Sequence, residues 1–528
     1  MNAPLPEIVR HFARFLGAGD PDAERAAALA SLATVEGHVC ADLDTDAGWG
    51  PWAAEMDSRS RDAFRERLSQ LPCVGAEEDW TPLVWDGRRL YLRRYWDYER
   101  RIADELSLRS RAIEPLSDAF ARRLDELFTD PGQRQAAEIA LRRRLALISG
   151  GPGTGKTHTL ARIIRLWQES RPDLRIALAA PTGKAAARIE EALAAAGVTL
   201  PGGAQTVHRL LGMRQDGSFR YRRARPLAVD ALVVDEASMI DLSLMSHLLD
   251  ALPPDARLIL LGDRDQLAAV EAGAVFADLC ESSRLGDNVA LLTTNFRFGT
   301  MSGIGRLAER LRSGDADGAL ALLASGADDL YWRPRGDSHA LVAAAREGYR
   351  EYLDGVAGGL DPAALFTRFE NFRVLCAHRE EAETINRLLT GDLLRPPLGT
   401  PIMALRNDPL LRVFNGDVGL LLNDPLDDRT KVFFPGTPAR WIPLHRLTAW
   451  TPAWAMTVHK AQGSEFAEVL LVLPANVSPV ATRELVYTGV TRAKQRVKLW
   501  SDETTLRAAL ERRSIRMSGL RERFQMPR

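Results

Sequence analysis

The segment GGPGTGKT at 150–157 constrains the fold of this chain more than any other stretch. It matches the pattern GxxxxGK[ST], which puts glycines where backbone N–H groups approach phosphate oxygens and a lysine where it reaches the terminal phosphates. The apolar run LALIS (145–149) precedes it, and apolar residues repeat at helical spacing from Leu160 to Trp167. A strand, a glycine-rich loop and a helix in this order predict a nucleotide-binding domain of the α/β class with a parallel sheet.

The loop predicts a site for ATP and Mg²⁺. Lys156 should reach the β- and γ-phosphates, and Thr157 should ligate the Mg²⁺ ion. Farther along, an apolar strand ends in Asp235 and Glu236. The first carboxylate should hold Mg²⁺ and the second should polarise the attacking water. Two acidic residues could also simply begin a loop, but after a P-loop the catalytic roles are favoured. The remaining nucleotide-binding residues that the loop predicts are Gly150, Gly151, Pro152, Gly153, Thr154 and Gly155.

Short apolar runs that end at Gly, Pro or Asp predict the buried parallel strands of two α/β units. Two segments differ from this pattern. The arginine-rich segment 212–226 predicts a small inserted hairpin, and an Asn-Gly turn at Asn415–Gly416 among prolines predicts an antiparallel β insertion at about 400–450. The predicted strands are 145–149, 175–180, 231–235, 257–263 and 288–294 in the first unit, and 372–377, 468–474 and 496–500 in the second.

Residues 1 to about 110 predict a separate N-terminal domain. The stretch 82–106 begins with strand-like alternation and then becomes helical. Tryptophans beside arginines are typical of a docking face, but they also fill ordinary cores, and the sequence leaves both interpretations open. Five of the eleven tryptophans lie in this region, at Trp49, Trp52, Trp80, Trp85 and Trp96.

The composition fits a multidomain globular protein. The 528 residues are 46% hydrophobic and 26% charged, and no apolar run reaches the length of a membrane span. The N-terminus shows no apolar signal segment, so we expect a cytoplasmic protein with no membrane partner. The formal net charge of -1 argues against strong non-specific binding to duplex DNA but leaves room for a narrow basic channel. The four cysteines are scattered, without metal-ligand or disulfide spacing.

Lysine is rare in this chain, with six lysines among 69 basic residues. Genome base composition alone would explain why lysine is scarce, but it does not explain where the remaining lysines lie. A lysine that is kept indicates a position that needs a compact point charge in place of the wide fork of arginine. Four of the six lie within the motifs described here, at Lys156, Lys184, Lys460 and Lys494, and the other two are Lys431 and Lys498.

Ten short motifs follow one another along the chain: GQRQAA (132–137), GGPGTGKT (150–157), APTGKAA (180–186), AQTVHRLLG (204–212), VVDEASMID (233–241), LGDRDQL (261–267), NFRF (295–298), NGDVG (415–419), TVHKAQGSEF (457–466) and VYTGVTRAK (486–494). In this order they resemble superfamily 1 DNA helicases and, among these, the RecD family, the alpha subunit of exodeoxyribonuclease V in the RecBCD complex. The strings GHVCADL (37–43) and RRLYLRRYW (88–96) resemble the N-terminal domain of that family more loosely.

The resemblance implies an α/β fold with two RecA-like P-loop domains and parallel sheets. It also implies a small SH3-like β insertion in the second of these domains and a mainly helical N-terminal domain. The expected bounds are 1–110 for the N-terminal, partner-docking domain, 111–300 for the first RecA-like ATPase domain with an insertion at about 212–228, and 301–528 for the second RecA-like domain with its β insertion at about 400–450.

The resemblance further implies roles for single residues in ATP hydrolysis. Gln133 would read the edge of adenine, as a Gln amide can, and Glu465 would lie near the ribose. Gln266 would sense the γ-phosphate. Arg297 and Arg492 would act as arginine fingers from across the cleft between the two RecA-like domains, which couples hydrolysis to domain closure. A surface salt bridge is the alternative role for Arg297, whose motif is the weaker of the two.

Hydroxyl groups, loop N–H groups and two lysines would line a groove for single-stranded DNA. Such groups suit phosphates because they allow the protein to step along DNA without reading its sequence. Lys494 could pair structurally rather than touch a ligand, and each histidine could equally be a packing residue. The implied DNA-binding residues are Thr182, Gly183, Lys184, Thr206, His208, Thr457, His459 and Lys460.

The implied function is an ATP-dependent, 5′→3′ single-stranded DNA translocase and helicase that acts in double-strand break repair and recombination. Its implied partners are a RecB-like helicase–nuclease and a RecC-like scaffold. A stand-alone superfamily 1 helicase is one alternative, although the helix-hairpin-helix signals of long-form RecD enzymes and the tyrosine and histidine cluster of relaxases are absent. A regulatory subunit that uses ATP as a switch is another. None of the six lysines follows a glutamate at the E-x-K spacing of metal nucleases, so nuclease activity is expected in a partner chain.

Overall fold

The computed structural model describes residues 5–299, 302–408, 410–436 and 438–524. It divides into two compact units. The first consists of Met1–Arg264, Ala268–Thr294 and Ile515–Arg528, and the second of Asp265–Leu267 and Asn295–Ser514. The division at 294–295 lies close to the expected boundary at 300, whereas the last residues of the chain belong to the first unit.

The N-terminal part of the first unit is mainly helical, as expected, and also contains a small sheet. Strands β1 (Cys40–Asp42), β4 (Arg89–Leu92), β3 (Leu83–Trp85) and β2 (Val74–Gly75) lie in that order. Asp20 caps the second helix by accepting from the N–H groups of Asp22 and Ala23. The helices are α1 (Glu7–Gly17), α2 (Pro21–Val35), α3 (Ser58–Leu68) and α4 (Arg93–Arg111), with the 3₁₀ segment η1 (Asp46–Ala54).

The tryptophans of this region divide between the core and the surface. Trp49 is fully buried and donates from Nε1 to the carbonyl of Leu43, and Trp96, on α4, is buried as well. Trp80, by contrast, is 95% exposed. Packing therefore explains Trp49 and Trp96, whereas Trp80 has the exposure that a docking residue needs.

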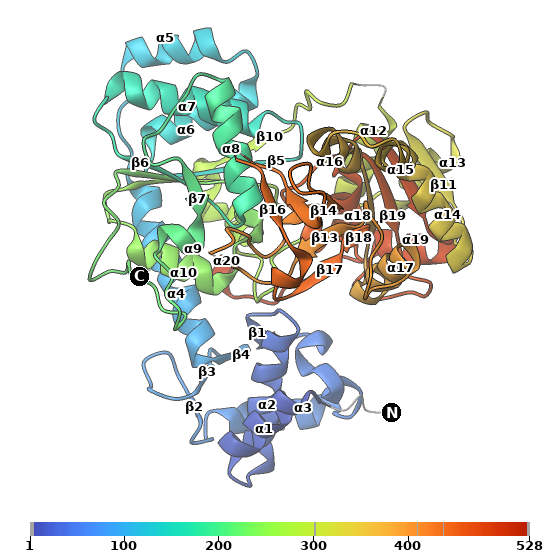
Figure 1. Ribbon diagram of the computed structural model, residues 1–528. Coiled ribbons are helices and arrows are strands. Elements are labelled where there is room, and N and C mark those ends of the chain that lie inside the picture. The colour runs from blue at the N-terminus through green and yellow to red at the C-terminus, as the bar shows by residue number, and fades with distance from the viewer. Residues whose placement is uncertain (1–4, 300–301, 409, 437, 525–528) are drawn as a thin grey trace. The chain divides into compact units, whose positions relative to one another are not determined.

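A six-stranded parallel sheet in the order β10-β5-β9-β8-β6-β7 forms the centre of the first unit (Figure 1). Five of its strands coincide with predicted ones, and the short edge strand β7 does not. In the segment 212–226, Met213 pairs with Phe219 and Arg222 with Arg225 in short antiparallel bridges. The strands are β5 (Leu145–Gly150), β6 (Ile176–Ala180), β7 (Ala204–Thr206), β8 (Ala231–Val234), β9 (Arg257–Gly262) and β10 (Val289–Leu292).

Helices cover both faces of this sheet. Leu145 and Leu147 of β5 face one core, together with α4, α10 and α11, whereas Ala146 and Ile148 face the other, with α6, α7 and α8. This alternation follows from the two-residue period of a strand and explains why the strands are apolar throughout. The remaining helices of the first unit are α5 (Asp118–Leu127), α6 (Pro131–Arg142), α7 (Lys156–Ser170), α8 (Gly183–Ala195), α9 (Val207–Leu210), α10 (Leu242–Ala251), α11 (Val275–Glu281) and α20 (Leu520–Arg523).

The second unit contains a five-stranded parallel sheet in the order β11-β20-β19-β12-β18. Helices cover both of its faces as well, in two separate clusters of buried residues. The strands are β11 (Leu330–Arg333), β12 (Phe372–Cys376), β18 (Ala455–Thr457), β19 (Phe466–Val472) and β20 (Ala493–Trp500). The helices are α12 (Gly303–Ser313), α13 (Ala316–Ala324), α14 (Ser338–Gly348), α15 (Arg350–Ala357), α16 (Pro362–Asn371), α17 (Arg379–Thr390), α18 (Arg483–Val490) and α19 (Glu503–Glu511).

The predicted antiparallel β insertion is confirmed within the second unit. Its five strands lie in the order β16-β15-β14-β13-β17, and all neighbours are antiparallel. Gly416, in the predicted Asn-Gly turn, has a φ of 92°, which a residue with a side chain rarely adopts. The strands are β13 (Pro401–Ala404), β14 (Val418–Asn423), β15 (Thr430–Phe434), β16 (Arg440–Ile442) and β17 (Trp450–Pro452).

The C-terminal segment packs into the first unit, where Met517, Leu520 and Phe524 join its core. Its main anchor is Glu99 of α4, which is fully buried. The carboxylate of Glu99 accepts from the N–H of Gly519 at 2.9 Å and from Nε of Arg523 at 2.8 Å. A buried carboxylate needs such partners, so this contact fixes the end of the chain against α4.

No helix among the described residues is long and apolar enough to cross a membrane. Within the same residues, no group of three or more His, Cys, Asp or Glu side chains could hold a metal ion. All four cysteines are buried, and none of them forms a disulfide within the described residues.

Candidate functional site

The P-loop joins the end of β5 to the start of α7. Gly153 and Gly155 have φ values of 84° and 81°, so glycine is required at both turns. A Cβ added to Gly150 would lie 2.9 Å from Cβ of Leu292, so the loop has no room for a larger residue there. No side chain caps the N-terminus of α7, which leaves its N–H groups and the positive end of its dipole for an anion.

Lys156, the first residue of α7, folds over this loop. Its Nζ donates to the carbonyls of Gly150 and Gly151, the latter at 3.1 Å. No carboxylate among the described residues pairs with it. An ammonium group held only by carbonyls at the mouth of an uncapped helix is placed to exchange them for phosphate oxygens.

Gln133 lies against the P-loop, on the neighbouring helix α6. Its Nε2 donates to the carbonyl of Thr154 at 3.3 Å, and the side chain is buried. Asp130 caps α6 by accepting from the N–H of Gln133 at 2.9 Å, and its other oxygen accepts from Thr294 at 2.6 Å. The structure thus brings Gln133 to the nucleotide loop, next to Thr154. Asp130 is a positioning residue that the sequence analysis missed, although Asp before Pro131 is a recognisable cap.

Asp235 and Glu236 follow the buried strand β8. The carboxylate of Asp235 is crowded by protein and accepts from the N–H of Glu236 at 2.9 Å. Burial and the charge of Glu236 raise its pKa, and Lys156 opposes that rise. Glu236 has a φ of 52°, a left-handed conformation that costs about 1–2 kcal/mol for a residue with a side chain. The destabilised charge and the strained backbone occur together at the end of one strand, as is common at functional sites.

These groups fit a magnesium nucleotide. Uncapped N–H groups and the ammonium of Lys156 match phosphate oxygens, and the hydroxyl of Thr157 and the carboxylate of Asp235 are oxygen ligands of the kind that Mg²⁺ takes. The pKa of Asp235 is raised although Lys156 and Arg188 both act to lower it, so these two cations compensate its charge only in part. A divalent cation would complete that compensation.

In the second unit, hydrogen bonds connect the segment of Gln266 to Arg492. The N–H of Leu267 donates to Oγ1 of Thr488 at 2.9 Å, and the carbonyl of Leu267 accepts from Nε2 of Gln462 at 2.8 Å. Arg492 in turn donates from Nε to the carbonyl of Thr488 at 3.2 Å. Thr488 and Gln462 are positioning residues that the sequence analysis did not single out, although both lie within the quoted motifs.

Arg492 is buried, with 2% of its surface exposed. Its guanidinium donates to the carbonyls of Thr488 and Ser464, at 3.2 and 3.3 Å, and no carboxylate among the described residues pairs with it. A buried cation without a counter-charge is costly, because carbonyl dipoles replace only part of its hydration. Such a group is suited to an anionic ligand.

Arg297 and Glu465 form an ion pair at 2.6 Å, and Lys494 approaches the other oxygen of Glu465 at 3.5 Å. Nη1 of Arg297 is buried without a hydrogen-bond partner among the described residues. The salt bridge that was the alternative role for Arg297 therefore exists, and the same guanidinium retains a donor for an anion. Lys494 lies beside a carboxylate, that of Glu465, as the structural alternative for this lysine requires.

In the first unit, the expected DNA-binding residues lie at the ends of two neighbouring parallel strands. Thr206 of β7 is in register with Ala180 of β6, the strand that precedes Thr182. Thr182 and Thr206 each cap a helix, α8 and α9, by accepting from the N–H three residues on. Both hydroxyls thus organise helix N-termini at one edge of the sheet, with Lys184 and His208 exposed on these helices.

In the second unit, Thr457, His459 and Lys460 lie at the equivalent place. Thr457 ends β18 in register with Cys376 of β12, and its Oγ1 accepts from the N–H of Lys460 at 3.4 Å. Partial desolvation and the neighbouring Arg379 lower the pKa of Lys460. The structure therefore gathers the expected DNA-binding residues at the carboxyl edge of a parallel sheet in each unit.

Three family models match the chain. They describe an AAA domain over residues 133–272, a UvrD-like helicase C-terminal domain over 452–500, and the N-terminal domain of the RecBCD enzyme subunit RecD over 4–91. The matches fall on the first sheet with its P-loop, on the end of the second sheet, and on the N-terminal region.

Individual proteins are similar over most of the chain. The RecBCD enzyme subunit RecD of Mycolicibacterium smegmatis is 41% identical over 549 residues, which cover 96% of this chain and 95% of that protein. The ATP-dependent RecD2 DNA helicase of Deinococcus radiodurans is 33% identical, over 80% of this chain and 54% of that protein. The crystal structure of Bacteroides Pif1 bound to single-stranded DNA matches with a TM-score of 0.43 at 16% identity, over 72% of this chain and 94% of that one.

Proposed function

Because the chain belongs to the RecD family of RecBCD enzyme subunits, we propose that it is an ATP-dependent 5′→3′ translocase and helicase on single-stranded DNA. It acts as a subunit of a RecBCD-type helicase–nuclease in double-strand break repair and recombination. The observation that carries this function is the pairing of an uncapped P-loop helix with the half-buried carboxylate of Asp235, whose pKa is raised. A protein that used the P-loop only as a structural turn would have no reason to keep that charge.

Thr157 and Asp235 would hold Mg²⁺, which would offset part of the charge on the phosphates of ATP. Lys156 binds the β- and γ-phosphates. Glu236 orients the attacking water and accepts its proton. Gln266 senses the γ-phosphate, and Arg492 stabilises the charge that develops on it, with Thr488 coupling the two through the bonds described above.

Gln133 recognises adenine, and Glu465 lies near the ribose. Arg297 alternates between Glu465 and the nucleotide, which its buried free donor allows. The strand-end loops of both units bind phosphates of single-stranded DNA through hydroxyls, N–H groups and lysines. The residues assigned to DNA are Thr182, Gly183, Lys184, Thr206, His208, Thr457, His459 and Lys460.

The similarity to the two kinds of relative favours a subunit over a stand-alone helicase. This chain is 41% identical to the M. smegmatis RecD subunit over 96% of its residues, but 33% identical to the RecD2 helicase over 80% of them. We therefore assign it RecB-like and RecC-like partner chains in the cytoplasm, with the nuclease in the RecB-like chain. The exposed Trp80 of the N-terminal domain belongs to the partner-docking surface.

The test compares unwinding of duplexes that carry either a 5′ or a 3′ single-stranded tail. Wild type and Lys156→Gln are measured alone and after mixing with RecB-like and RecC-like chains. We expect unwinding from the 5′ tail only, loss of it in the variant, and a stronger reaction in the mixture. Unwinding from the 3′ tail would contradict the polarity, and equal activity with and without partners would favour a stand-alone enzyme.

A further inference from the structure

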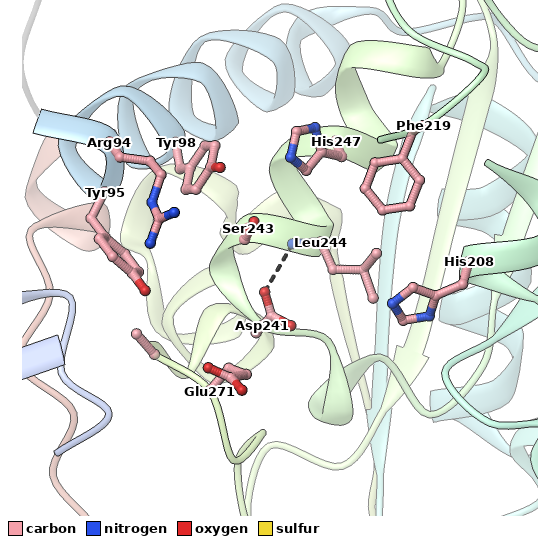
Figure 2. Close-up of a pocket in the computed structure, with 11 residues that line it drawn as sticks. Arg94, Tyr95, Tyr98, His208, Phe219, Asp241, Ser243, Leu244, His247 and Glu271 are labelled. Atoms are coloured by element: carbon pink, nitrogen blue, oxygen red, sulfur yellow. Dashed lines mark hydrogen bonds between the residues drawn. The ribbon is translucent and has the colours of Figure 1, made fainter. Parts of the chain in front are cut away.

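A pocket in the first unit is lined by the expected DNA-binding residue His208 and by residues to which the sequence analysis gave no role (Figure 2). Its volume is about 260 Å³, and residues of α4, α9, α10 and the arginine-rich hairpin line it. Ligand pockets for whole small molecules usually measure roughly 300–1,000 Å³, so this one suits a single planar group.

Five rings form a continuous row around the pocket. Tyr95 lies 6.1 Å from Tyr98, Tyr98 lies 5.6 Å from His247, His247 lies 5.0 Å from Phe219, and Phe219 lies 6.3 Å from His208. Figure 2 shows the tyrosines on one side of the pocket and Phe219 with His208 on the other. All these centroid distances lie within the range of aromatic contacts.

Three of the rings pack against the core, but the core does not bury them completely. Tyr95, Tyr98 and Phe219 pack against the buried cluster of the first unit and remain partly exposed, and His208 is exposed. Burial lowers the pKa of His247, so its ring is uncharged at neutral pH and offers a flat face like the others. A row of half-exposed rings is a stacking platform.

Charge distinguishes the pocket from its rim. Asp241 and Glu271 lie on its lower wall and outnumber the guanidinium of Arg94, which also lines the pocket, so the lining disfavours a phosphate inside it. The hairpin outside carries five exposed arginines and one aspartate over 212–226, although the whole chain has a net charge of -1. Phosphates are therefore attracted to the hairpin and excluded from the pocket. The arginines are Arg214, Arg220, Arg222, Arg223 and Arg225.

We propose that this pocket takes one unpaired base of the single-stranded DNA, stacked on the ring row, while the hairpin arginines hold the adjoining phosphates. The proposal rests on the proposed function and extends the DNA path from Thr206 and His208 beyond the phosphate-binding loops. Because every base has an aromatic face, the pocket strengthens binding without reading sequence.

The test uses the full chain and oligonucleotides that carry the fluorescent adenine analogue 2-aminopurine at successive positions, since its emission falls when it stacks. We expect quenching at one position in the wild type. Phe219→Leu and Tyr98→Leu should each relieve the quenching. Each should also weaken binding of single-stranded DNA about tenfold, because part of one stacking contact is lost. Tyr331→Leu removes an exposed ring from the second unit and should change neither readout.

Each other outcome has a defined meaning. Unchanged quenching in both pocket variants would overturn the inference while DNA-stimulated ATP hydrolysis still supports the proposed function. Absence of that stimulation in the wild type would overturn both. Variants that keep DNA binding and quenching but lose binding to the partner chains would show that the pocket receives a protein side chain instead. Thermal unfolding of each variant distinguishes misfolding from a local effect.

Discussion

Asp235 and Asp424 each follow an apolar strand directly, yet their environments differ. Asp424, after β14, accepts from Nζ of Lys431 at 2.7 Å, and that lysine also binds Asp427 at 2.8 Å. The lysine holds the pKa of Asp424 below its ordinary value. Asp235, after β8, is also influenced by Lys156 and Arg188, but burial and the charge of Glu236 outweigh these cations and raise its pKa.

The two lysines mirror this difference. Lys431 has two carboxylates, whereas Lys156 has only two carbonyls. A charge that stabilises the fold is neutralised within the fold, while a charge kept for a ligand is only partly compensated, at a cost in stability. The sequence shows only which residues are ionic. The degree to which each charge is compensated in the fold separates the structural ones from the functional ones.

The largest expected effect concerns an arginine. Arg492 is buried on carbonyls, whereas the half-buried Arg496 pairs with Glu468. Arg492→Lys should lower the turnover of DNA-stimulated ATP hydrolysis by roughly 10³-fold, because an ammonium lacks the fork of an arginine finger. Arg496→Lys should stay within about twofold of the wild type. Equal rates for the two variants would remove the distinction.

The next effect compares the lysines directly. Lys156→Gln should reduce ATP hydrolysis at least about 100-fold, the scale of losing one charge-stabilising donor. Lys431→Gln should leave hydrolysis near the wild-type rate and lower the midpoint of thermal unfolding, because Asp424 and Asp427 lose their cation. If Lys431→Gln also abolished hydrolysis while remaining folded, the β insertion would belong to the catalytic machinery.

The aspartates should differ in the sign of their pH dependence. The pKa of Asp235 is raised to about 6 from 3.8, so its stabilising contribution is complete below pH 3.8 and is lost as the pH rises through 6. Asp235→Asn should therefore be more stable than the wild type by about 1–2 kcal/mol at pH 7.5 without Mg²⁺, and the gap should close near pH 4. It should also be inactive.

Asp424→Asn should behave in the opposite way. Because the pKa of Asp424 is lowered in the folded protein, its carboxylate stabilises the fold at pH values above the ordinary pKa. This stabilisation is lost as the pH falls through the lowered pKa. This variant should be less stable than the wild type at neutral pH. Denaturant unfolding of both variants between pH 4 and 7.5 measures the two slopes, and slopes of the same sign would contradict the comparison.

The smallest effect concerns the backbone. Glu236 and Asp428 have φ values of 52° and 53°. Glycine at either position should raise the free energy of unfolding by about 1 kcal/mol, because it removes the left-handed strain. Only Glu236→Gly should lose ATP hydrolysis. Loss of stability in Glu236→Gly would show that the side chain holds the fold.

The sequence predicted most of the two parallel sheets, because buried strands are apolar runs bounded by turn residues. The strands β5, β6, β8, β9, β10, β12, β19 and β20 lie where apolar runs occur, and the insertion was marked by its Asn-Gly turn. The N-terminal sheet was largely missed, since its strands have two to four residues and carry no clear period. The return of the C-terminal segment to the first unit depends on Glu99, some 420 residues away along the chain.

In the candidate site, the motifs predicted the residues that lie within a loop or directly after a strand, such as Lys156 and Asp235. It could not identify partners that meet only in the fold, such as the bond between Leu267 and Thr488. The ring row was missed for the same reason, since Tyr98, Phe219 and His247 lie on three separate segments.

The most direct test of the account is ATP hydrolysis by purified wild type and Lys156→Gln, with and without single-stranded DNA. Hydrolysis by the wild type should rise at least tenfold with DNA, and in the variant both basal and stimulated hydrolysis should be lower at least about 100-fold. Wild-type hydrolysis that does not respond to single-stranded DNA, alone or with partner chains, would contradict the motor. The ATP site would then be a regulatory switch.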